Sequence, residues 1–187
     1  MLVAKEVTID IKKDKEGLGQ IKDLYATAFP KREQVALPFL IKQTKKASVA
    51  FDAFYDGDVF VGFTYTLFYK DIVYLWYFAT CSNLRSKGYG AQMLQQLYET
   101  HAGKRIVLNL DAQDELAADS EIRKRRKDFY LRNGYLPTGY LCMFHGNKLD
   151  VMTRGGSVAP EEFVSIFKEF FGILHLIVKP KILLGEQ

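Results

Sequence analysis

The sequence predicts an α/β fold with a mixed central sheet and helices on both faces. Three observations lead to it: two early segments with helical spacing, a hairpin of two apolar strands, and a strand–helix–strand unit in the middle of the chain. With 187 residues, 48% of them hydrophobic, the chain is long enough for one substantial core and short for two ordinary domains. We therefore expect one domain over residues 1–187, in which 156–187 form an apolar C-terminal extension.

The first third of the chain predicts one strand and two helices. VTIDI, residues 7–11, alternates in polarity as a half-buried strand does. Apolar residues then recur every three or four positions from 18 to 28, and Pro30 ends this helical pattern. A second helix is expected around residues 35–41, with Pro38 as an irregularity in its pattern.

Three strands are expected next. Residues 48–55 and 59–69 are rich in apolar and aromatic side chains and flank Asp56-Gly57-Asp58, where the glycine can adopt the positive φ of a tight hairpin turn. These two segments should therefore pair antiparallel. Lys70-Asp71 indicates another short turn, and IVYLWYFAT, residues 72–80, predicts a buried strand.

The middle of the chain predicts a parallel strand–helix–strand unit. A helical stripe that follows Gly90 and ends at Gly103 connects the strand at 72–80 to RIVLNL, residues 105–110. The elements expected after it are a helix with Ser120 as N-cap that ends at Gly134, strands at 139–144 and 149–153 around a turn at Gly146-Asn147, and a helix at about 160–171 with Pro160 in its first turn.

The charge balance and the cysteine content narrow the class of protein. The chain has 26 Lys and Arg against 22 Asp and Glu, a formal net charge of +4 at pH 7 and an isoelectric point near 8.9. This mild excess suits an anionic ligand but is small for a nucleic-acid-binding surface, so no nucleic acid partner is expected. The two cysteines, Cys81 and Cys142, lack metal-ligand spacing, so we expect neither a disulfide framework nor a metal site.

Neither end of the chain has the pattern of a targeting or membrane segment. Charged residues interrupt the N-terminal stretch MLVAKEVTIDIKKDKEG, where a signal peptide needs a continuous apolar core. The C-terminal stretch FVSIFKEFFGILHLIVKPKILL is apolar, but its charge-free runs are far shorter than the ~20 residues of a membrane span. We therefore expect a cytoplasmic protein without membrane attachment. Residues 172–187 either complete the fold or cover a partner chain, for example in a homodimer.

The segment LRSKGYGAQML, residues 84–94, lies where a predicted strand gives way to a helix. Gly88 and Gly90 at that position would let a phosphate approach unpaired backbone N–H groups without meeting a Cβ. No Gly-Lys-Ser/Thr follows, so a P-loop is excluded, and Met93 replaces the third glycine of a dinucleotide-binding loop. The segment thus predicts a phosphate-binding loop of another kind. The alternative is a tight turn that binds no ligand.

Two motifs in this order resemble the GNAT superfamily of N-acetyltransferases. Residues 85–90, RSKGYG, match its R/Q-x-x-G-x-G/A signature, and residues 129–135, FYLRNGY, resemble its FYxKxGF segment. The order of elements from residue 5 to about 153 resembles the whole GNAT domain, while AFPKREQ and the basic segment 111–130 resemble bacterial members. The resemblance implies an acetyltransferase of the GNAT fold, with its sheet splayed apart at the strand that holds the cofactor.

The resemblance implies acetyl-coenzyme A as the cofactor. It places the backbone of Phe78, Ala79 and Thr80 along the pantetheine arm, and a backbone N–H near Phe78 at the thioester oxygen. The residues that it places around the pyrophosphate are Arg85, Ser86, Lys87, Gly88, Tyr89, Gly90 and Ala91.

Tyr130 is the general acid that the resemblance implies, because a phenol with a pKa of ~10 can protonate the departing thiolate. The alternative is a core tyrosine on an apolar helix face with Ile122 and Phe129. Many family members have a glutamate on the strand before the loop, but residues 72–80 contain no carboxylate. Asp111 and Glu33 are therefore the candidates for the general base. A water chain, or an amine that binds already neutral, would replace it.

Arg123 and Arg126 share one side of a predicted helix with Tyr130, because they precede it by seven and four residues. We assign both to the 3′-phosphate of coenzyme A. The alternatives are a solvated cationic face and an RNA-binding patch. Arg123 also occupies the position where many GNAT proteins have an asparagine that bonds to pantetheine.

The predicted reaction is direct attack of a primary amine on the thioester within a ternary complex. The acceptor, a small molecule or a protein amine, should lie against Phe29, Glu33 and Phe39 and against the hairpin at 140–152. Three alternatives remain open. Cys81 could carry the acetyl group in a ping-pong scheme. The chain could be a GNAT-like module that binds coenzyme A or RNA without catalysis, or a methyltransferase with a different cofactor.

Overall fold

The structure, a computed structural model, describes residues 2–6, 15–144, 146–172 and 180–184. The chain divides into two compact units. The N-terminal unit consists of Met1–Leu67 and Leu75–Thr100, and the C-terminal unit consists of Phe68–Tyr74 and His101–Gln187. The prediction that these residues form one domain stays a prediction.

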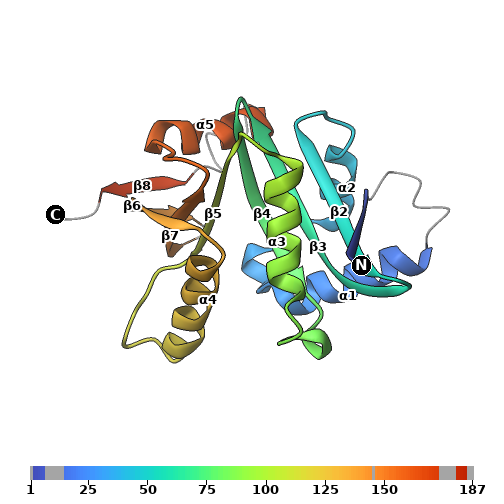
Figure 1. The fold of residues 1–187 in the computed structure, drawn as a ribbon. Helices are drawn as coiled ribbons and strands as arrows, with labels where there is room; N and C mark the ends of the chain where they lie inside the picture. Colours follow the sequence, from blue (N-terminus) through green and yellow to red (C-terminus); the bar gives the residue numbers. More distant parts are fainter. Residues whose placement is uncertain (1, 7–14, 145, 173–179, 185–187) are drawn as a thin grey trace. The chain divides into compact units, whose positions relative to one another are not determined.

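The strands of the described residues form one eight-stranded mixed sheet (Figure 1). Its members are β1 (Leu2–Glu6), β2 (Val49–Asp56), β3 (Val59–Tyr69), β4 (Ile72–Thr80), β5 (Arg105–Asp111), β6 (Leu136–Phe144), β7 (Asn147–Arg154) and β8 (Lys181–Leu184). Hydrogen-bonded neighbours follow the order β1-β2-β3-β4-β5-β7-β6-β8. The first three residues of β4 pair parallel with the first three of β5, whereas β1–β2, β2–β3, β5–β7, β6–β7 and β6–β8 are antiparallel. The predicted fold class is confirmed.

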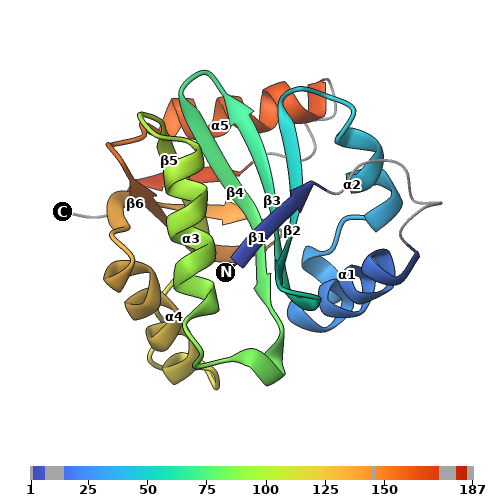
Figure 2. The ribbon, with the colours of Figure 1, turned by 45° about the vertical axis from the view of Figure 1, so that its right-hand side comes forward.

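Helices cover both faces of the sheet in the N-terminal unit (Figures 1 and 2). Its helices are α1 (Lys15–Ala28), α2 (Leu37–Gln43), α3 (Tyr89–Thr100) and the 3₁₀ helices η1 (Lys31–Glu33) and η2 (Ser82–Leu84). Tyr25 of α1 packs edge-on against Tyr77 of β4, with the ring centroids 5.1 Å apart. On the other side Met93 of α3 is fully buried against Phe54 and Val61. Adjacent strand residues point to opposite faces of a sheet. Tyr77 accordingly faces α1, and its neighbour Phe78 faces α3.

The strands β3 and β4 approach each other unusually closely at Gly62. A Cβ added at Gly62 would lie 2.1 Å from the carbonyl oxygen of Ala79, a distance that no side chain tolerates. The register between β2 and β3 shifts just here, since Phe54 pairs with Gly62 and Tyr55 pairs with Phe60. The extra residue between them, Val61, produces a β-bulge. Glycine is therefore required at position 62 for this backbone contact.

In the C-terminal unit, α4 (Ser120–Arg132) and α5 (Pro160–Phe171) accompany the strands. Phe163 and Phe167 of α5 pack on Tyr74, with ring centroids 5.5 and 5.3 Å away. The Tyr74 hydroxyl donates a hydrogen bond to the side-chain oxygen of Asn109 on β5. The aromatic residues of the predicted C-terminal extension therefore form part of the core of this unit.

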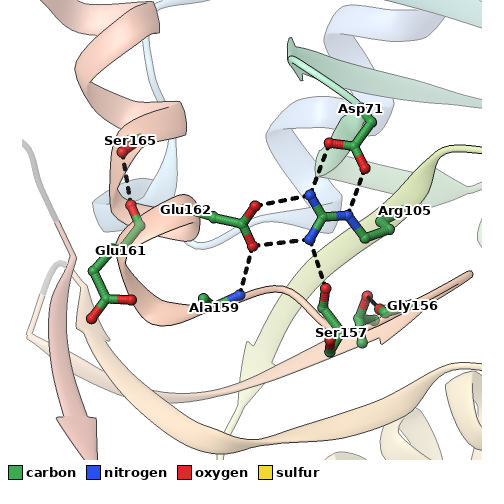
Figure 3. A network of polar contacts seen from close by, with 9 residues as sticks. Asp71, Arg105, Gly156, Ser157, Ala159, Glu161, Glu162 and Ser165 are labelled. Carbon is green, nitrogen blue, oxygen red and sulfur yellow. Dashed lines mark hydrogen bonds and ion pairs between the residues drawn. The ribbon is translucent and has the colours of Figure 1, made fainter.

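Arg105 at the start of β5 joins three segments of the C-terminal unit (Figure 3). Its guanidinium donates two hydrogen bonds of 2.7 and 2.8 Å to the Asp71 carboxylate and two of 2.9 Å to that of Glu162. It also donates to the carbonyl oxygen of Ser157 at 2.7 Å. A Cβ at Gly156 would lie 3.1 Å from the Arg105 side chain, so the glycine makes room for it. The turn before β4 is thereby tied to the start of α5.

Most of the elements expected among the described residues are present, and some details differ. The strand expected at 7–11 lies outside the described residues, and the strands β1 and β8 were not predicted. Ser120 is the first helical residue of α4, and Asp119 takes the N-cap position instead. Pro38 is no irregularity, because it occupies the first turn of α2, where its missing N–H has no intrahelical acceptor. In the tail, β8 pairs with β6 and so extends the sheet.

Gly62→Ala should destabilise the protein by about 1–3 kcal/mol or more, because the new methyl group must push β3 away from β4. Gly19→Ala is the matched control: this glycine lies within α1, a Cβ there meets nothing within 4 Å, and alanine should stabilise the helix by up to about 1 kcal/mol. Urea unfolding of both variants measures the difference. Equal stability of the two variants would contradict the close approach.

Arg105→Gln should destabilise the protein most at neutral pH. Arg105 lowers the pKa of the carboxyls of Asp71 and Glu162 by hydrogen bonding to them. A carboxyl whose pKa is lower in the folded than in the unfolded protein stabilises the fold at pH values above its unfolded pKa of about 4. That stabilisation is lost as the pH falls through the pKa of the folded state. The difference in unfolding free energy between wild type and variant should therefore shrink from about pH 6 to about pH 2.5. An undiminished difference at the acidic end would show that these ion pairs do not stabilise the fold.

Candidate active site

The glycine loop connects β4 to α3 and leaves amide groups exposed at the helix start. After the 3₁₀ turn η2 (Ser82–Leu84), Ser86 and Gly88 both have positive φ, of 64° and 80°. The Gly88 carbonyl accepts the first helical hydrogen bond, from the Gln92 amide at 3.1 Å. The amides of Tyr89, Gly90 and Ala91 therefore belong to the first turn, where no intrahelical acceptor exists. Together with the positive end of the helix dipole, these donors are suited to bind an anion.

The loop has a strained backbone at Ser86, and contacts with β2 and with the core hold it in place. Ser86 adopts a left-handed conformation that residues with a Cβ rarely take, and such positions cluster at functional sites. The hydroxyl of Tyr89 donates to Oδ2 of Asp56 at 2.8 Å and so holds the helix start against the end of β2. Leu84 and Tyr89 also pack beside the buried Met93. The loop therefore has a defined position within the N-terminal unit.

The backbone of β4 presents alternate residues to its two edges. The Ala79 carbonyl lies against Gly62 of β3, and the Cys81 amide donates to the Val61 carbonyl at 2.8 Å. Because the N–H and C=O groups of successive strand residues point to opposite edges, those of Phe78 and Thr80 face the edge away from β3. The close approach of β3 to β4 at Gly62 thus determines which backbone groups of β4 point to the edge away from β3.

Tyr77 and Trp76 interrupt the regular alternation of β4. Their rings are stacked, 5.1 Å apart with an interplanar angle of 17°, and both contact Tyr65, at 6.2 and 6.1 Å. Adjacent residues of a regular strand point to opposite faces, so two neighbours on one face indicate a local irregularity. This irregularity lies directly before Phe78.

Cys81 has the properties of a protonated thiol. It is half-buried, its Sγ lies 3.5 Å from the Phe60 carbonyl oxygen, and burial raises its pKa. The thiolate is the nucleophilic form, so a raised pKa disfavours Cys81 as an acetyl carrier.

The expected acceptor residues lie around the α1–α2 connection of the N-terminal unit. Phe29 packs against Tyr77 at 4.9 Å and against Phe63 at 6.3 Å. The Glu33 side chain is 31% exposed, and its Oε1 lies 3.6 Å from Nε of Arg32. Phe39 is half-buried in α2. The structure thus places two aromatic rings and one partly exposed carboxylate in this region.

In the C-terminal unit, Tyr130 is the buried residue of an otherwise polar α4. Burial raises the pKa of Tyr130 to about 12, and the positive charge of Arg126, one turn earlier, opposes part of this effect. The ring contacts that of Tyr135 edge-on at 5.7 Å. Ile122 is 56% exposed, so the apolar face that it was expected to form with Phe129 is absent at that position. The phenol is therefore protonated throughout the physiological range.

Three cations on the side of α4 that carries Tyr130 pair with acids. Arg123 binds Asp119 at 2.8 Å and the Ala112 carbonyl at 3.0 Å, Arg126 binds Asp111 at 3.0 Å, and Lys127 binds Asp150 at 2.8 Å. The outward side carries three further cations interspersed with two acids: Glu121, Lys124, Arg125, Asp128 and Arg132. A mixed face of this kind is typical of a solvated helix and offers no uniform cationic patch.

The candidate residues are therefore distributed over both units. The N-terminal unit holds the β4 edge, the glycine loop and the acceptor residues, and the C-terminal unit holds Tyr130, Asp111, Arg123 and Arg126. Sequence reasoning missed Gly62, Asp56 and Tyr77. A tyrosine in an aromatic strand looks like any core residue in sequence, and only the register shows what its hydroxyl meets.

The described residues contain neither a metal-binding cluster nor a membrane-spanning helix. No group of three or more His, Cys, Asp or Glu side chains there could hold a metal ion. Within the same residues, no helix has both the length and the apolar character that crossing a membrane requires.

The chain belongs to the GNAT acetyltransferase family, whose sequence model matches residues 18–135. No curated protein sequence matches the chain. Among solved structures, a protein from Bacteroides thetaiotaomicron described as a GNAT-family acetyltransferase superposes with a TM-score of 0.71 at 22% identity, covering 94% of this chain and 98% of that one.

Two other solved structures share the fold at lower identity. The ribosomal-protein-S18-alanine N-acetyltransferase from Escherichia coli gives a TM-score of 0.61 at 16% identity, covering 86% of this chain and 97% of that one. An aminoglycoside 6′-N-acetyltransferase complexed with coenzyme A gives 0.64 at 19% identity, covering 81% and 96%. At these identities the likeness establishes the fold and leaves the acceptor open.

Proposed function

We propose that the protein is an acetyl-coenzyme A-dependent N-acetyltransferase that transfers the acetyl group to a primary amine by direct attack in a ternary complex. The observation that carries this proposal is the glycine loop, whose amides at the start of α3 follow directly on the β4 edge in a chain of the GNAT family. A cytoplasmic location and the possibility of a homodimer remain part of the proposal.

The proposed cofactor site combines main-chain donors with exposed cations. The amides of residues 88–91 would bind the pyrophosphate, and the exposed Arg85 and Lys87 would add positive charge beside it. Ser86 would shape the loop. The pantetheine arm would lie along Phe78–Thr80 and pair with the outward-facing backbone groups as an added strand does. Coenzyme A supplies the activated acetyl thioester; the chain binds and orients it.

Oxyanion stabilisation is assigned to the backbone near Phe78. An amine that attacks a thioester converts the carbonyl oxygen into an oxyanion, and a preorganised N–H stabilises that charge without reorganisation. The irregularity at Trp76 and Tyr77 supports this assignment, because a bulge redirects the backbone groups of the residues around it.

Tyr130 is proposed as the group that donates a proton to the departing sulfur. With a pKa of about 12 it is a donor and never a base at neutral pH. Its hydrogen bond would stabilise negative charge on sulfur as the carbon–sulfur bond breaks. Arg126 and Arg123 are proposed to bind the 3′-phosphate of coenzyme A. Their side chains also bind Asp111 and Asp119.

The attacking ammonium must lose a proton, and a carboxylate or water is proposed to accept it. Glu33, whose side chain is partly exposed in the α1–α2 connection, is proposed to attract a cationic acceptor. Asp111 is the second candidate, although it is held by Arg126. The acceptor is proposed to be a small molecule or a protein amine, since proteins with this fold act on groups as different as a ribosomal-protein alanine and an aminoglycoside.

The proposed alternative, a GNAT-like module that binds coenzyme A or RNA without catalysis, rested on the basic sequence of α4 and on the missing carboxylate in β4. Three cations of α4, Arg123, Arg126 and Lys127, are paired with Asp119, Asp111 and Asp150, and its opposite face is mixed in charge. These pairs argue against RNA binding, and turnover with a panel of amines separates an enzyme from a module that only binds coenzyme A.

Gly88→Ala should weaken acetyl-coenzyme A binding by about tenfold, because a left-handed conformation with a Cβ costs about 1–2 kcal/mol and the loop would relax away from it. Isothermal titration calorimetry measures the change. Gly57→Ala is the matched control, since Gly57 also has positive φ (58°) but lies in the β2–β3 turn. It should lose similar stability and keep its affinity. Equal losses of affinity in both variants would rule out a specific role for the loop.

Tyr130→Phe should lower kcat by about 100-fold or more while leaving acetyl-coenzyme A affinity unchanged, because the ring is kept and the proton donor is lost. Steady-state kinetics over a panel of primary amines test this. The control is Tyr135→Phe, whose buried hydroxyl has no hydrogen-bond partner among the described residues. Its kcat should stay within about twofold. A Tyr130→Phe enzyme with wild-type kcat would remove Tyr130 from the mechanism.

A further inference from the structure

Tyr77 has a hydroxyl that reaches from the sheet to the connection between α1 and α2. The residue is 3% exposed on β4, and its ring is packed against Tyr25 and Phe29. The hydroxyl donates a hydrogen bond of 2.7 Å to the backbone carbonyl of Glu33. It also accepts one of 3.3 Å from the Val35 amide. A single buried phenol thus binds the chain at two points of this connection.

The connecting segment, residues 30–35, depends on side chains for its position. Its internal backbone hydrogen bonds are short-range ones, from Glu33 to Pro30 and from Gln34 to Lys31. The Tyr25 hydroxyl donates to the Val35 carbonyl at 3.0 Å and accepts from the Val35 amide at 2.9 Å. Tyr25 therefore ties the segment to α1, whereas Tyr77 ties it to the sheet.

The position of Tyr77 on β4 depends on the local irregularity of that strand. Tyr77 shares a face with its neighbour Trp76, which regular alternation would not allow. The next residue is Phe78, where the proposed cofactor edge begins. The group that holds the acceptor segment is thus the direct neighbour in sequence of the backbone that would hold the thioester.

We propose that Tyr77 is a positioning residue that sets the distance between the acceptor and the thioester. Its hydroxyl fixes the backbone of Glu33, and through it the carboxylate that would attract a cationic amine. Reacting atoms must be held about 3–3.5 Å apart, and a displacement of about 1 Å is enough to lower the rate strongly. This inference rests on the proposed function, because it assigns residues 30–35 to the acceptor side.

Tyr77→Phe keeps the packed ring and removes the hydroxyl, so it tests this role directly. The loss of one hydrogen bond to a half-buried carbonyl should lower kcat/KM for the amine acceptor by about threefold to tenfold and leave KM for acetyl-coenzyme A within about twofold. The matched control is Tyr74→Phe on the same strand, which loses its hydrogen bond to Asn109 in the C-terminal unit. Its acceptor kcat/KM should not change. The panel contains an aliphatic diamine, an aminoglycoside and peptides with a free N-terminus.

The carbonyl ¹³C chemical shift of Glu33, measured by NMR, gives a second readout that needs no acceptor. Tyr77→Phe removes the hydrogen bond that this carbonyl accepts and should shift its resonance, and Tyr74→Phe should not. A shifted Glu33 resonance with an unchanged acceptor kcat/KM, or a kcat/KM that falls equally in both variants, overturns the positioning role. An unchanged Glu33 resonance overturns the tether itself. A wild-type protein that acetylates none of the amines contradicts the proposed function, and the Glu33 shift still decides whether the tether exists.

Discussion

The contact between Gly62 and the Ala79 carbonyl determines how the end of β4 is presented. Because β3 lies so close, Ala79 and Cys81 direct their backbone groups toward it, and Phe78 and Thr80 direct theirs to the opposite edge. The bulge at Val61 accommodates the contact. The chain then leaves β4 through a strained turn and enters α3 with its first amides exposed. A ligand with an amide-bearing arm and a diphosphate matches this succession of strand edge and helix start.

The two units supply different parts of the proposed chemistry. The N-terminal unit provides main-chain N–H donors. These groups do not titrate, and most side-chain substitutions leave them in place. The C-terminal unit provides Tyr130, whose burial keeps the phenol protonated, on a helix anchored by ion pairs from Arg123, Arg126 and Lys127. These pairs explain why a helix with so many cations has a mixed surface. Because the cations of α4 are paired with acids, the exposed Arg85 and Lys87 of the glycine loop form a cationic feature separate from that helix.

Local signals predicted much of the fold. Gly57 and Gly134 mark a turn and a helix end because their positive φ excludes most other residues, and Pro160 begins α5 because its missing N–H is harmless there. The edge strands β1 and β8 were missed, since they depend on partners distant in sequence. The glycine loop and Tyr130 were proposed as site residues through motifs. Tyr77 and Gly62 were not, because a hydroxyl contact and a backbone approach arise from tertiary register that residue type does not encode.

The account depends most on the amides of Tyr89, Gly90 and Ala91 as diphosphate ligands. Amide exchange at these three positions, followed by NMR at saturating acetyl-coenzyme A, tests this directly. In the free protein they lack helical acceptors and should exchange rapidly; the cofactor should slow them at least about tenfold, whereas acetyl-pantetheine, which has no diphosphate, should leave them fast. Exchange that stays rapid with the cofactor fully bound would contradict the proposed mode of binding.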